Sequence, residues 1–527
     1  MSRVLIVTMI SSILSIQAAS INPEEKVRQP AVAGAFYPAN PAELGKMIDG
    51  FLSQANPVPV KNLVALVSPH AGYIYSGPVA AYSYALLKGR KIERVIVIAP
   101  SHYEMFDFAS VYDGAAYSTP LGEIPVDREF ARRLAALSPH IRLSDRGHAL
   151  YPGRSEHALE VQLPFLQHVL GPFKLVPVIM GAQDYDLCRA LGVSLAELIS
   201  GPETLIVASS DLSHYHPYDE AVTIDHKTLK AIEEWDYLSM ARNFERRVWE
   251  ACGGGPIVAA MIAAERLGAN EATVLRYANS GDTTGDHSRV VGYGAVAFSK
   301  SHDPSRAEQS FSLSTKEKEQ LLQIAKKSVE MAVKEGKLYE CSAGGLEALM
   351  HERGAFVTLR RNGELRGCIG YVAAMKPLCH TVRDVAAMAA IRDQRFPPVA
   401  ARELDQLEYE VSVLSPLRRV ADIQQIRVGR DGLLIKKGDT EGLLLPQVAT
   451  EQRWGRVTFL EQTCRKAGLP PHAWQDPDTD IFRFSALIFG QHGPAQAVTP
   501  DRIWLPKQQG WPTPPGQDSR LPSAGPS

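Results

Sequence analysis

The fold is decided by the stretch LVALVSPHAG, residues 63–72, in which an apolar run leads into His70. The same pattern recurs in VIVIAPSHYE (95–104), which contains His102, and in LIVASSDLSHYH (205–216), which contains Asp211 and His214. Near-continuous apolar runs of this length are typical of strands that are buried on both faces of a parallel sheet. Carboxyl ends of parallel strands meet at one edge of a sheet, so neighbouring strands would bring these polar residues into one pocket. A single histidine after a strand is more often a loop residue, so the recurrence carries the prediction.

Helical segments separate the apolar runs. We predict helices at 127–137 and 187–198, and a further strand at 175–180. Strands that alternate with helices in this way predict an α/β layer fold with a mainly parallel sheet.

The composition is that of an ordinary globular protein. The chain has 527 residues, 45% of them hydrophobic, with a formal net charge of −2. This excludes a mostly disordered, collagen-like or coiled-coil protein, and the bulk charge gives no support to a polyanion-binding role. Six cysteines without a CxxC pair argue against a disulfide scaffold and against a zinc ribbon.

Composition shifts along the chain predict two domains. We place the first at 27–300, a polar linker at 301–312, and the second at 313–489. An amphipathic helix at 316–335 opens the second domain, and mixed helices and short strands predict an α+β fold for it. The extension at 490–527 is rich in Pro, Gly and Ser, and we expect it to be disordered from about residue 506.

Residues 1–26 are either a signal segment or a non-native start. The apolar stretch Val4–Ile16 has the length of a signal-peptide core and is too short for a spanning helix. We expect a cytoplasmic location, and export by a signal peptide is the alternative. We expect no membrane association unless this segment is an uncleaved anchor.

A cysteine in a glycine-rich loop is the next candidate. Cys252 precedes Gly253-Gly254-Gly255-Pro256 and a predicted helix at 257–267. A thiolate near a helix amino end is stabilised by the helix dipole, so Cys252 is a candidate metal ligand or nucleophile. The alternative is a small residue packed under a loop.

Two further segments carry candidate groups. His157, in Glu156-His157-Ala158-Leu159-Glu160, is a candidate for substrate orientation or acid/base chemistry, and the alternative is the start of a surface helix. The stretch SGDTTGDHSRVVGYG contains Asp282, Asp286 and His287, which either line the same cleft or form turns.

Two histidines and one anionic ligand leave open positions on a metal. With a carboxylate as the third ligand, this is the facial triad of non-haem Fe(II) oxygenases. A thiolate makes the site softer and still suits Fe(II), Zn or Cu(I). A thiol–imidazole nucleophile built from Cys252 and His214 is the competing chemistry.

The first domain resembles the Memo family. The resemblance rests on RQPAVAGAFYP (28–38), SPHAGYIYSGPVAA (68–81), APSHY (99–103), EHALEVQLPFL (156–166), SSDLSHY (209–215) and the Cys252 loop. It implies a three-layer α/β fold like that of LigB-type extradiol dioxygenases, with bound iron or copper. By motif, it assigns the metal ligands to His70, His102 and Cys252, and places Asp211 and His214 in the adjoining pocket. The loop Cys-Gly-Gly-Gly-Pro departs from members with polar residues there, which bears on pocket shape.

The second domain resembles the AMMECR family. The motifs are GAFVTLRRNGELRGCIGY (354–371), RDQRFPPV (392–399), LEYEVSVLSP (407–416) and GLLLPQVATEQRW (442–454). Nucleic-acid or nucleotide binding has been proposed for this family, so we treat nucleic acid as a weakly supported ligand. A basic patch would need the fold to gather Arg360, Arg361, Arg366, Arg392 and Arg395. Cys368 is either a reactive thiol or a small buried residue in a tight turn.

The order of the domains resembles bacterial AmmeMemoRadiSam fusion proteins. This implies a radical SAM enzyme as a separate partner, because the chain lacks a CxxxCxxC motif. The resulting hypothesis is an Fe(II)-dependent, dioxygenase-like oxidoreductase, with Cu or Zn as other metals and an unknown small-molecule or peptide substrate. His214 would be the acid/base, supported by Asp211 and His157. The alternative is a non-catalytic protein that binds a metal, a peptide or a modified residue.

Overall fold

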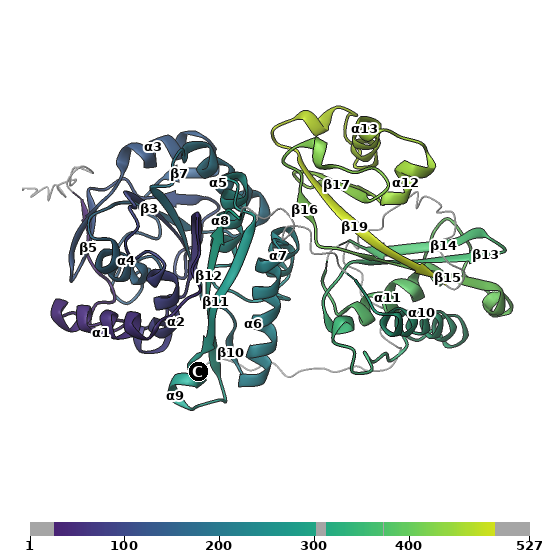
Figure 1. Ribbon diagram of the computed structural model, residues 1–527, viewed down its shortest axis with the longest axis horizontal. Helices are drawn as coiled ribbons and strands as arrows, with labels where there is room; N and C mark the ends of the chain where they lie inside the picture. Colours follow the sequence, from purple (N-terminus) through teal and green to yellow (C-terminus); the bar gives the residue numbers. More distant parts are fainter. Residues whose placement is uncertain (1–25, 302–311, 373, 491–527) are drawn as a thin grey trace, which may run out of the picture. The chain divides into compact units, whose positions relative to one another are not determined.

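The computed structural model of the chain describes residues 26–301, 312–372 and 374–490 (Figure 1). The chain divides into two compact units, Met1–Ala307 and Glu308–Ser527. Apart from single residues at their borders, the predicted signal segment (1–26), linker (301–312) and carboxyl-terminal extension (490–527) lie outside the described residues. Among the helices of the described part, none is long and apolar enough to cross a membrane.

The first unit is built on a large sheet with the strand order β10-β12-β2-β9-β3-β8-β4-β7, and β11 pairs with β12. Its strands are β2 (Leu63–Ser68), β3 (Arg94–Pro100), β4 (Ala109–Val111), β7 (Ile141–Leu143), β8 (Lys174–Met180), β9 (Thr204–Ser209), β10 (His214–His216), β11 (Glu271–Asn279) and β12 (Val290–Ser299). A small separate sheet consists of β1 (Val27–Arg28), β5 (Ala116–Thr119) and β6 (Gly122–Pro125).

The strands expected from the apolar runs at 63–67, 95–99, 175–180 and 205–208 are present as β2, β3, β8 and β9. These four lie side by side and pair in parallel. The flanks differ from the expectation of a mainly parallel sheet: β12 is antiparallel to β2, β10 and β11, and β4 is antiparallel to β8. The sheet is therefore mixed. Strands β11 and β12 follow one another along the chain, whereas β12 meets β2 and β10, and β4 meets β8, across long stretches of sequence. The edge strand β7 is parallel to β4.

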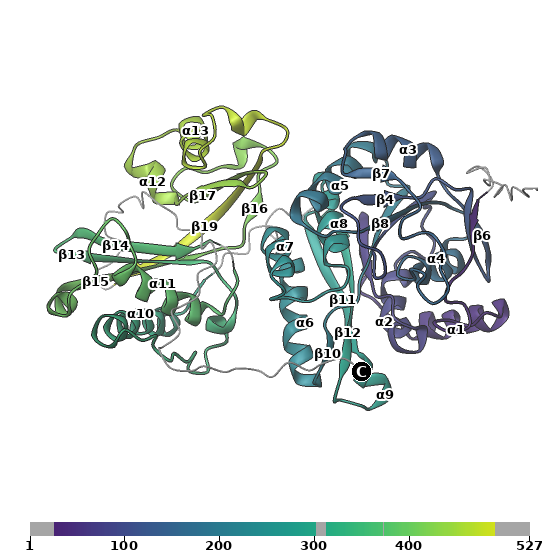
Figure 2. The ribbon, with the colours of Figure 1, turned by 180° about the vertical axis from the view of Figure 1, so that it is seen from behind.

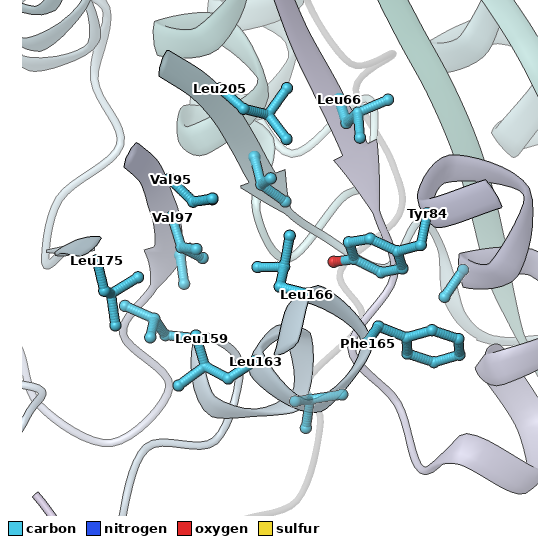
Figure 3. Close-up of a cluster of buried hydrophobic side chains, with 14 of the residues drawn as sticks. Leu66, Tyr84, Val95, Val97, Leu159, Leu163, Phe165, Leu166, Leu175 and Leu205 are labelled. Carbon is cyan, nitrogen blue, oxygen red and sulfur yellow. The ribbon is translucent and has the colours of Figure 1, made fainter. Parts of the chain in front are cut away.

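Helices pack on this sheet from opposite faces. They are α1 (Pro41–Gln54), α2 (Tyr73–Ala85), α3 (Arg128–Ala136), η2 (Glu160–Gln162), α4 (Leu163–Leu170), α5 (Tyr185–Leu198), α6 (Tyr218–Glu233), α7 (Tyr237–Glu245), α8 (Gly254–Arg266) and α9 (Ser280–Thr284). On β3, the side chains of Val95 and Val97 join a core cluster with Tyr84 of α2 and Phe165 of α4 (Figure 3). Since strand side chains alternate, the buried Ile96 and Ile98 face the other side, and α8 contacts β2, β3 and β9.

Helix α8 is buried along its length because it lies between the sheet and further helices. It contacts α5 and α7 as well as the strands, and its residues from Gly254 to Ala264 are buried. Burial all round explains its nearly uniform apolar sequence. It also fixes the amino end of α8, next to Cys252, against the carboxyl ends of the parallel strands.

The second unit has an antiparallel sheet with the order β14-β13-β15-β19-β17-β18, and β16 pairs with β19. Its strands are β13 (Ala355–Arg361), β14 (Glu364–Tyr371), β15 (Leu407–Leu414), β16 (Arg418–Arg419), β17 (Asp431–Lys437), β18 (Thr440–Leu444) and β19 (Asp480–Gly490). The helices are α10 (Thr315–Glu335), η4 (Glu347–Met350), α11 (Leu378–Ile391), η5 (Ala401–Gln406), η6 (Ile423–Gln425), α12 (Pro446–Glu451), α13 (Arg456–Lys466) and η7 (Ala473–Gln475).

Helices α10 and α11 lie side by side in both views and share a core with β13 and β15 (Figure 2). A capping box fixes the start of α10, in which the Ser314 side chain and Glu317 exchange hydrogen bonds with each other's backbone. The mixture of helices with an antiparallel sheet agrees with the expected α+β class.

Candidate metal centre

The polar residues that follow β2, β9 and β3 lie together because these three strands are neighbours and parallel. His70 and Asp211 each come two residues after the end of their strand, β2 and β9, and His102 comes two residues after β3. Cys252 comes just before α8, whose amino end meets the same edge. The pocket expected from the recurring motif is thus formed by the topology of the sheet.

Two overlapping groups of donor atoms form the centre. One is His70, His102 and His157, and the other is His70, Asp211 and Cys252; within each, the donor atoms all lie within 4.8 Å of one another. His70 belongs to both. The set His70, His102 and Cys252, implied by the family resemblance, is divided between the two groups. His157, expected as an acid/base residue, stands among the candidate ligands.

The hydrogen bonds of Ser209 fix the tautomer of His70. The Ser209 hydroxyl donates its one proton to the carbonyl oxygen of Ala158, at 2.7 Å. It therefore accepts from His70 Nδ1, at 2.9 Å, so this nitrogen carries a proton. Gln162 Nε2 also donates to the hydroxyl, at 2.6 Å. The lone pair of His70 is then on Nε2, which faces Cys252 Sγ at 3.1 Å.

Glu156 orients His102 in a similar way. Its carboxylate accepts from His102 Nδ1 at 3.0 Å and from the His102 backbone N–H at 2.6 Å. Burial works to raise the pKa of Glu156, but the hydrogen bond and charge of His102 outweigh it and hold the pKa at about 2. The ionised carboxylate keeps the proton on Nδ1 and leaves the His102 Nε2 lone pair for a ligand. Metal-binding histidines almost always donate their other ring N–H to such a partner, which is a carboxylate, a backbone carbonyl or water.

Cys252 is held as a buried, neutral thiol. Burial and the charge of Asp211 raise the pKa of Cys252 well above its usual range. The expected stabilisation of a thiolate by the amino end of α8 is therefore outweighed, which disfavours a free nucleophile at neutral pH. The Asp211 backbone N–H donates to Cys252 Sγ at 3.2 Å, so the sulfur has a donor for its charge when a cation replaces the proton.

Asp211 and His214 complete the surroundings. Asp211 Oδ1 accepts from the backbone N–H groups of His70, at 2.7 Å, and Ala71, at 3.3 Å. Burial raises the pKa of Asp211. His214 in β10 donates from Nδ1 to the Leu212 carbonyl oxygen at 2.9 Å, because a carbonyl oxygen can only accept. Its Nε2 is the nitrogen left for proton exchange.

Burial keeps the other imidazoles neutral. It lowers the pKa of His157 to about 4 and holds the pKa of His70 well below 6.5. The His157 ring packs on the ring of His102, with 4.9 Å between centroids, and on Phe36, at 4.7 Å. Neutral imidazoles, a buried carboxyl and a buried thiol form a desolvated donor set whose lone pairs suit a transition metal.

Comparison with known proteins matches the chain to the two families that its sequence motifs resemble. The model of the family described as Memo-like protein matches residues 28–297, about half of the chain. The chain belongs to the Memo family. The AMMECR1 model matches residues 322–489, so a Memo-like domain is fused to an AMMECR1 domain. We refer to these stretches as the Memo unit and the AMMECR1 unit. Family membership supports a fold related to that of LigB-type dioxygenases.

Similar proteins are archaeal MEMO1 family proteins. One from Methanopyrus kandleri is 39% identical over 51% of this chain and 98% of its own length. Another, from Sulfolobus acidocaldarius, is 40% identical over 52% of this chain and 99% of its own length. Among solved structures, that of the uncharacterized protein PH0010 from Pyrococcus horikoshii is 40% identical, covers 35% of this chain and 96% of its own, and has a TM-score of 0.34. These relatives give no support to the bacterial source implied by the domain order.

Sequence reasoning missed the residues that orient the histidines. Glu156 and Gln162 lie within the quoted stretch EHALEVQLPFL, and Ser209 opens SSDLSHY, but none was predicted to act on a ligand. The one available signal was Glu156, a carboxylate directly before His157. The contacts of Ser209 and Gln162 depend on the pairing of β2 with β9, which no local pattern reveals.

For the Gly-rich stretch around α9, the contacts support the interpretation as turns over the interpretation as residues that line the cleft. Asp282 caps α9 by accepting from the Asn279 backbone N–H at 2.8 Å. Asp286 accepts from the backbone and hydroxyl of Ser288, and the ring of His287 stacks on Tyr218 at 4.3 Å. These contacts account for the three residues through local structure.

In the AMMECR1 unit, Cys368 is a buried residue of β14 and is not in a turn. Burial raises its pKa to about 11, which disfavours a reactive thiolate and supports the alternative of a small buried residue. Arg361 and Arg366 both pair with Glu403, at 3.0 Å, and Arg395 pairs with Asp393. These carboxylates offset much of the expected basic patch.

Proposed function

We propose that the Memo unit is a transition-metal-binding oxidoreductase with Fe(II) as its metal, of the dioxygenase-like class, and that Cu or Zn can occupy the same centre. The observation that carries the proposal is the directed lone pair of His70, which the Ser209 hydroxyl sets on Nε2 toward Cys252. His102 is prepared in the same sense by Glu156. Imidazole lone pairs directed in this way can bind a cation, whereas packing in a protein core does not require them.

The donor set suits this metal. His70 and His102 supply nitrogen, and Cys252 or Asp211 supplies an anionic ligand on the His70 side. His157 supplies a further nitrogen on the His102 side. Sites with two histidines and one anion leave coordination positions open to other molecules, and bound Fe(II) contributes redox chemistry toward dioxygen.

The other residues of the chain act on binding and on protons. His214 Nε2 is the exchanging nitrogen of the acid/base residue, and Asp211 positions the backbone of His70 through its Oδ1. Phe36 and Tyr103 lie beside the ring of His157, with centroid distances of 4.7 and 6.4 Å. They offer apolar surface to a small aromatic substrate.

The test is metal analysis of the full chain purified without oxygen. Elemental mass spectrometry of the wild type should find iron, and the variant His70→Ala should lose it, because His70 belongs to both donor groups. His140→Ala is the matched control, since His140 is exposed and lies outside both groups. Circular dichroism would show that all three proteins are folded.

Two results would contradict the proposal. One is a folded wild type that contains no metal and takes up none from Fe(II), Cu or Zn. The other is a His70→Ala variant that retains the metal. If iron binds but catechol-like compounds cause no oxygen uptake, the alternative of a non-catalytic binding protein is favoured. The radical SAM partner stays a prediction, to be checked by co-purification.

A further inference from the structure

The AMMECR1 unit contains a second cluster of donor atoms, formed by Cys341, Cys379 and His380. Their sulfur and ring nitrogen atoms lie within 4.8 Å of one another. Cys379 and His380 are in the first turn of α11, and Cys341 is in the irregular segment between α10 and η4. The cluster is independent of the metal centre and plays no part in the function proposed above. We call Cys341 and Cys379 the thiol pair.

The thiol pair lies at the border of the unit's core. Cys379 is 1% exposed and belongs to the core cluster, whereas Cys341 is half-buried and packs against it. The Cys341 thiol donates to the carbonyl oxygen of Cys379 at 3.5 Å. One sulfur is therefore within reach of small molecules, and the other is protected behind it.

The Cys341 thiol has one proton, which it can direct either to the Cys379 carbonyl oxygen or to the Cys379 sulfur. Hydrogen bonding from Cys341 lowers the pKa of Cys379 to about 7, with help from the backbone N–H groups at the start of α11. The same bond raises the pKa of Cys341. The singly ionised pair therefore carries its negative charge mainly on Cys379, and attack by Cys341 requires the Cys341 proton to pass to the Cys379 sulfur.

The surrounding charge favours thiolate over a bound cation. Arg383 lowers the pKa of both thiols, and Lys376 lies close enough to act on His380. Asp384 forms ion pairs with Arg383 at 2.7 Å and with Lys376 at 2.6 Å. Its single negative charge offsets only one of these two positive charges. The amino end of α11 adds a further positive potential. The remaining positive charge weakens the binding of a cation here and stabilises an anionic sulfur.

We propose that Cys341 and Cys379 form a thiol–disulfide exchange site that is oxidised by small-molecule disulfides. The Cys341 thiolate attacks the external disulfide, which forms a mixed disulfide and releases one external thiolate. Cys379 then attacks the Cys341 sulfur, which forms the internal disulfide and releases the second external thiolate. Two protein thiols are oxidised, one external disulfide is reduced, and the two protein protons pass to the released thiols.

Closure of the bond is compatible with the local structure. The sulfurs must approach from within 4.8 Å to about 2.05 Å, the length of a disulfide. Cys379 is fixed by α11, but Cys341 is in a segment without helix or strand hydrogen bonds, which can shift at low cost. Oxidation would then attach this segment to the start of α11.

The test uses the full chain with oxidised glutathione as the probe. After an acid quench and alkylation with N-ethylmaleimide, peptide mapping should find a Cys341–Cys379 cross-link that dithiothreitol removes. The rate should rise between about pH 6 and pH 8 as the thiol pair ionises. In Cys379→Ser, glutathione should stay attached to Cys341, because the second thiol is missing. Cys464→Ser is the matched control and should form the same cross-link as the wild type, since Cys464 is buried elsewhere.

The wild-type map decides the question even if the Cys379 variant does not fold. The proposal is overturned if both thiols remain open to alkylation in a mixture that oxidises a short dithiol peptide. It is also overturned if zinc or copper, resistant to a chelator, is bound through these residues and prevents their oxidation.

Discussion

A single hydroxyl proton, that of Ser209, determines which nitrogen of His70 keeps a lone pair for the metal centre. Ser209→Ala removes the acceptor of His70 Nδ1, while Gln162 keeps its bond to the Pro69 carbonyl at 3.0 Å. We expect the metal affinity to fall by about 10–100-fold with the fold retained, as is usual when a group that orients a ligand is lost. Competition with a chromophoric chelator measures this. Ser83→Ala, which removes a buried hydroxyl bonded to the Val67 carbonyl, should leave the affinity unchanged; equal losses in both variants would contradict the assignment.

The His102–Glu156 pair predicts the pH dependence of metal binding. Burial works to lower the pKa of His102, but the hydrogen bond and charge of Glu156 outweigh it, so the pKa is raised above 6.5. A proton on His102 competes with the metal, so affinity should fall as the pH drops through this raised value. His70 and His157, whose pKa values are lowered, stay neutral there.

The variant Glu156→Gln tests that reasoning. Loss of the carboxylate should move the midpoint of metal release to lower pH by about one unit. Metal retention is measured by dialysis across a pH series, and the midpoints are compared. Asp49→Asn, in the surface pair of Asp49 with His168, is the control and should leave the midpoint in place. If the midpoint of metal release in Glu156→Gln were unchanged or moved to higher pH, Glu156 would not be what raises the pKa of His102.

Among the elements, α8 depends on a close approach to β9. A Cβ on Gly253 would lie 2.2 Å from the backbone oxygen of Ser209, which cannot move without distorting the strand. We expect Gly253→Ala to destabilise the chain by about 1–3 kcal/mol and to shift Cys252 away from His70, which weakens metal binding. Thermal unfolding and metal analysis measure the two effects.

The control for this element is Gly50→Ala in α1, where an added Cβ meets nothing within 4 Å. Alanine replaces glycine in a helix interior there, so stability should rise by about 0.5–1 kcal/mol and metal binding should not change. If Gly253→Ala behaved like Gly50→Ala, the contact of α8 with β9 would not be what positions Cys252.

For the Memo unit as a whole, one buried ion pair joins distant parts of the chain. Glu160 is fully buried and pairs with Arg28, and it also accepts from Tyr37 Oη at 2.6 Å and the backbone N–H of Ala31 at 2.7 Å. Glu160→Ala leaves a buried guanidinium without its carboxylate. We expect a loss of about 3–5 kcal/mol.

Chemical denaturation measures this loss. Asp113→Ala, which breaks exposed and half-exposed pairs with Arg132 and Arg128, is the control and should cost at most about 1 kcal/mol per pair. A Glu160→Ala protein as stable as this control would show that Arg28 finds water or another partner.

Sequence patterns predicted the middle of the Memo unit better than its borders. The runs before His70, His102 and Asp211 are buried on both faces, and such strands are recognisable without knowledge of their neighbours. The antiparallel strands β10 and β12 depend on contacts far away in the chain, so the mixed sheet was not predicted. The division of the ligands into two groups around His70 also depends on three-dimensional geometry.

The position of His70 in both donor groups limits the capacity of the centre. An imidazole with a proton on Nδ1 has one lone pair, and one lone pair serves one cation at a time. Two adjacent sets of ligands therefore do not amount to two sites. Titration of the Memo unit within the full chain should saturate at a single equivalent of metal, and a cation held by His70 can exchange His102 and His157 for Asp211 and Cys252 without leaving the protein.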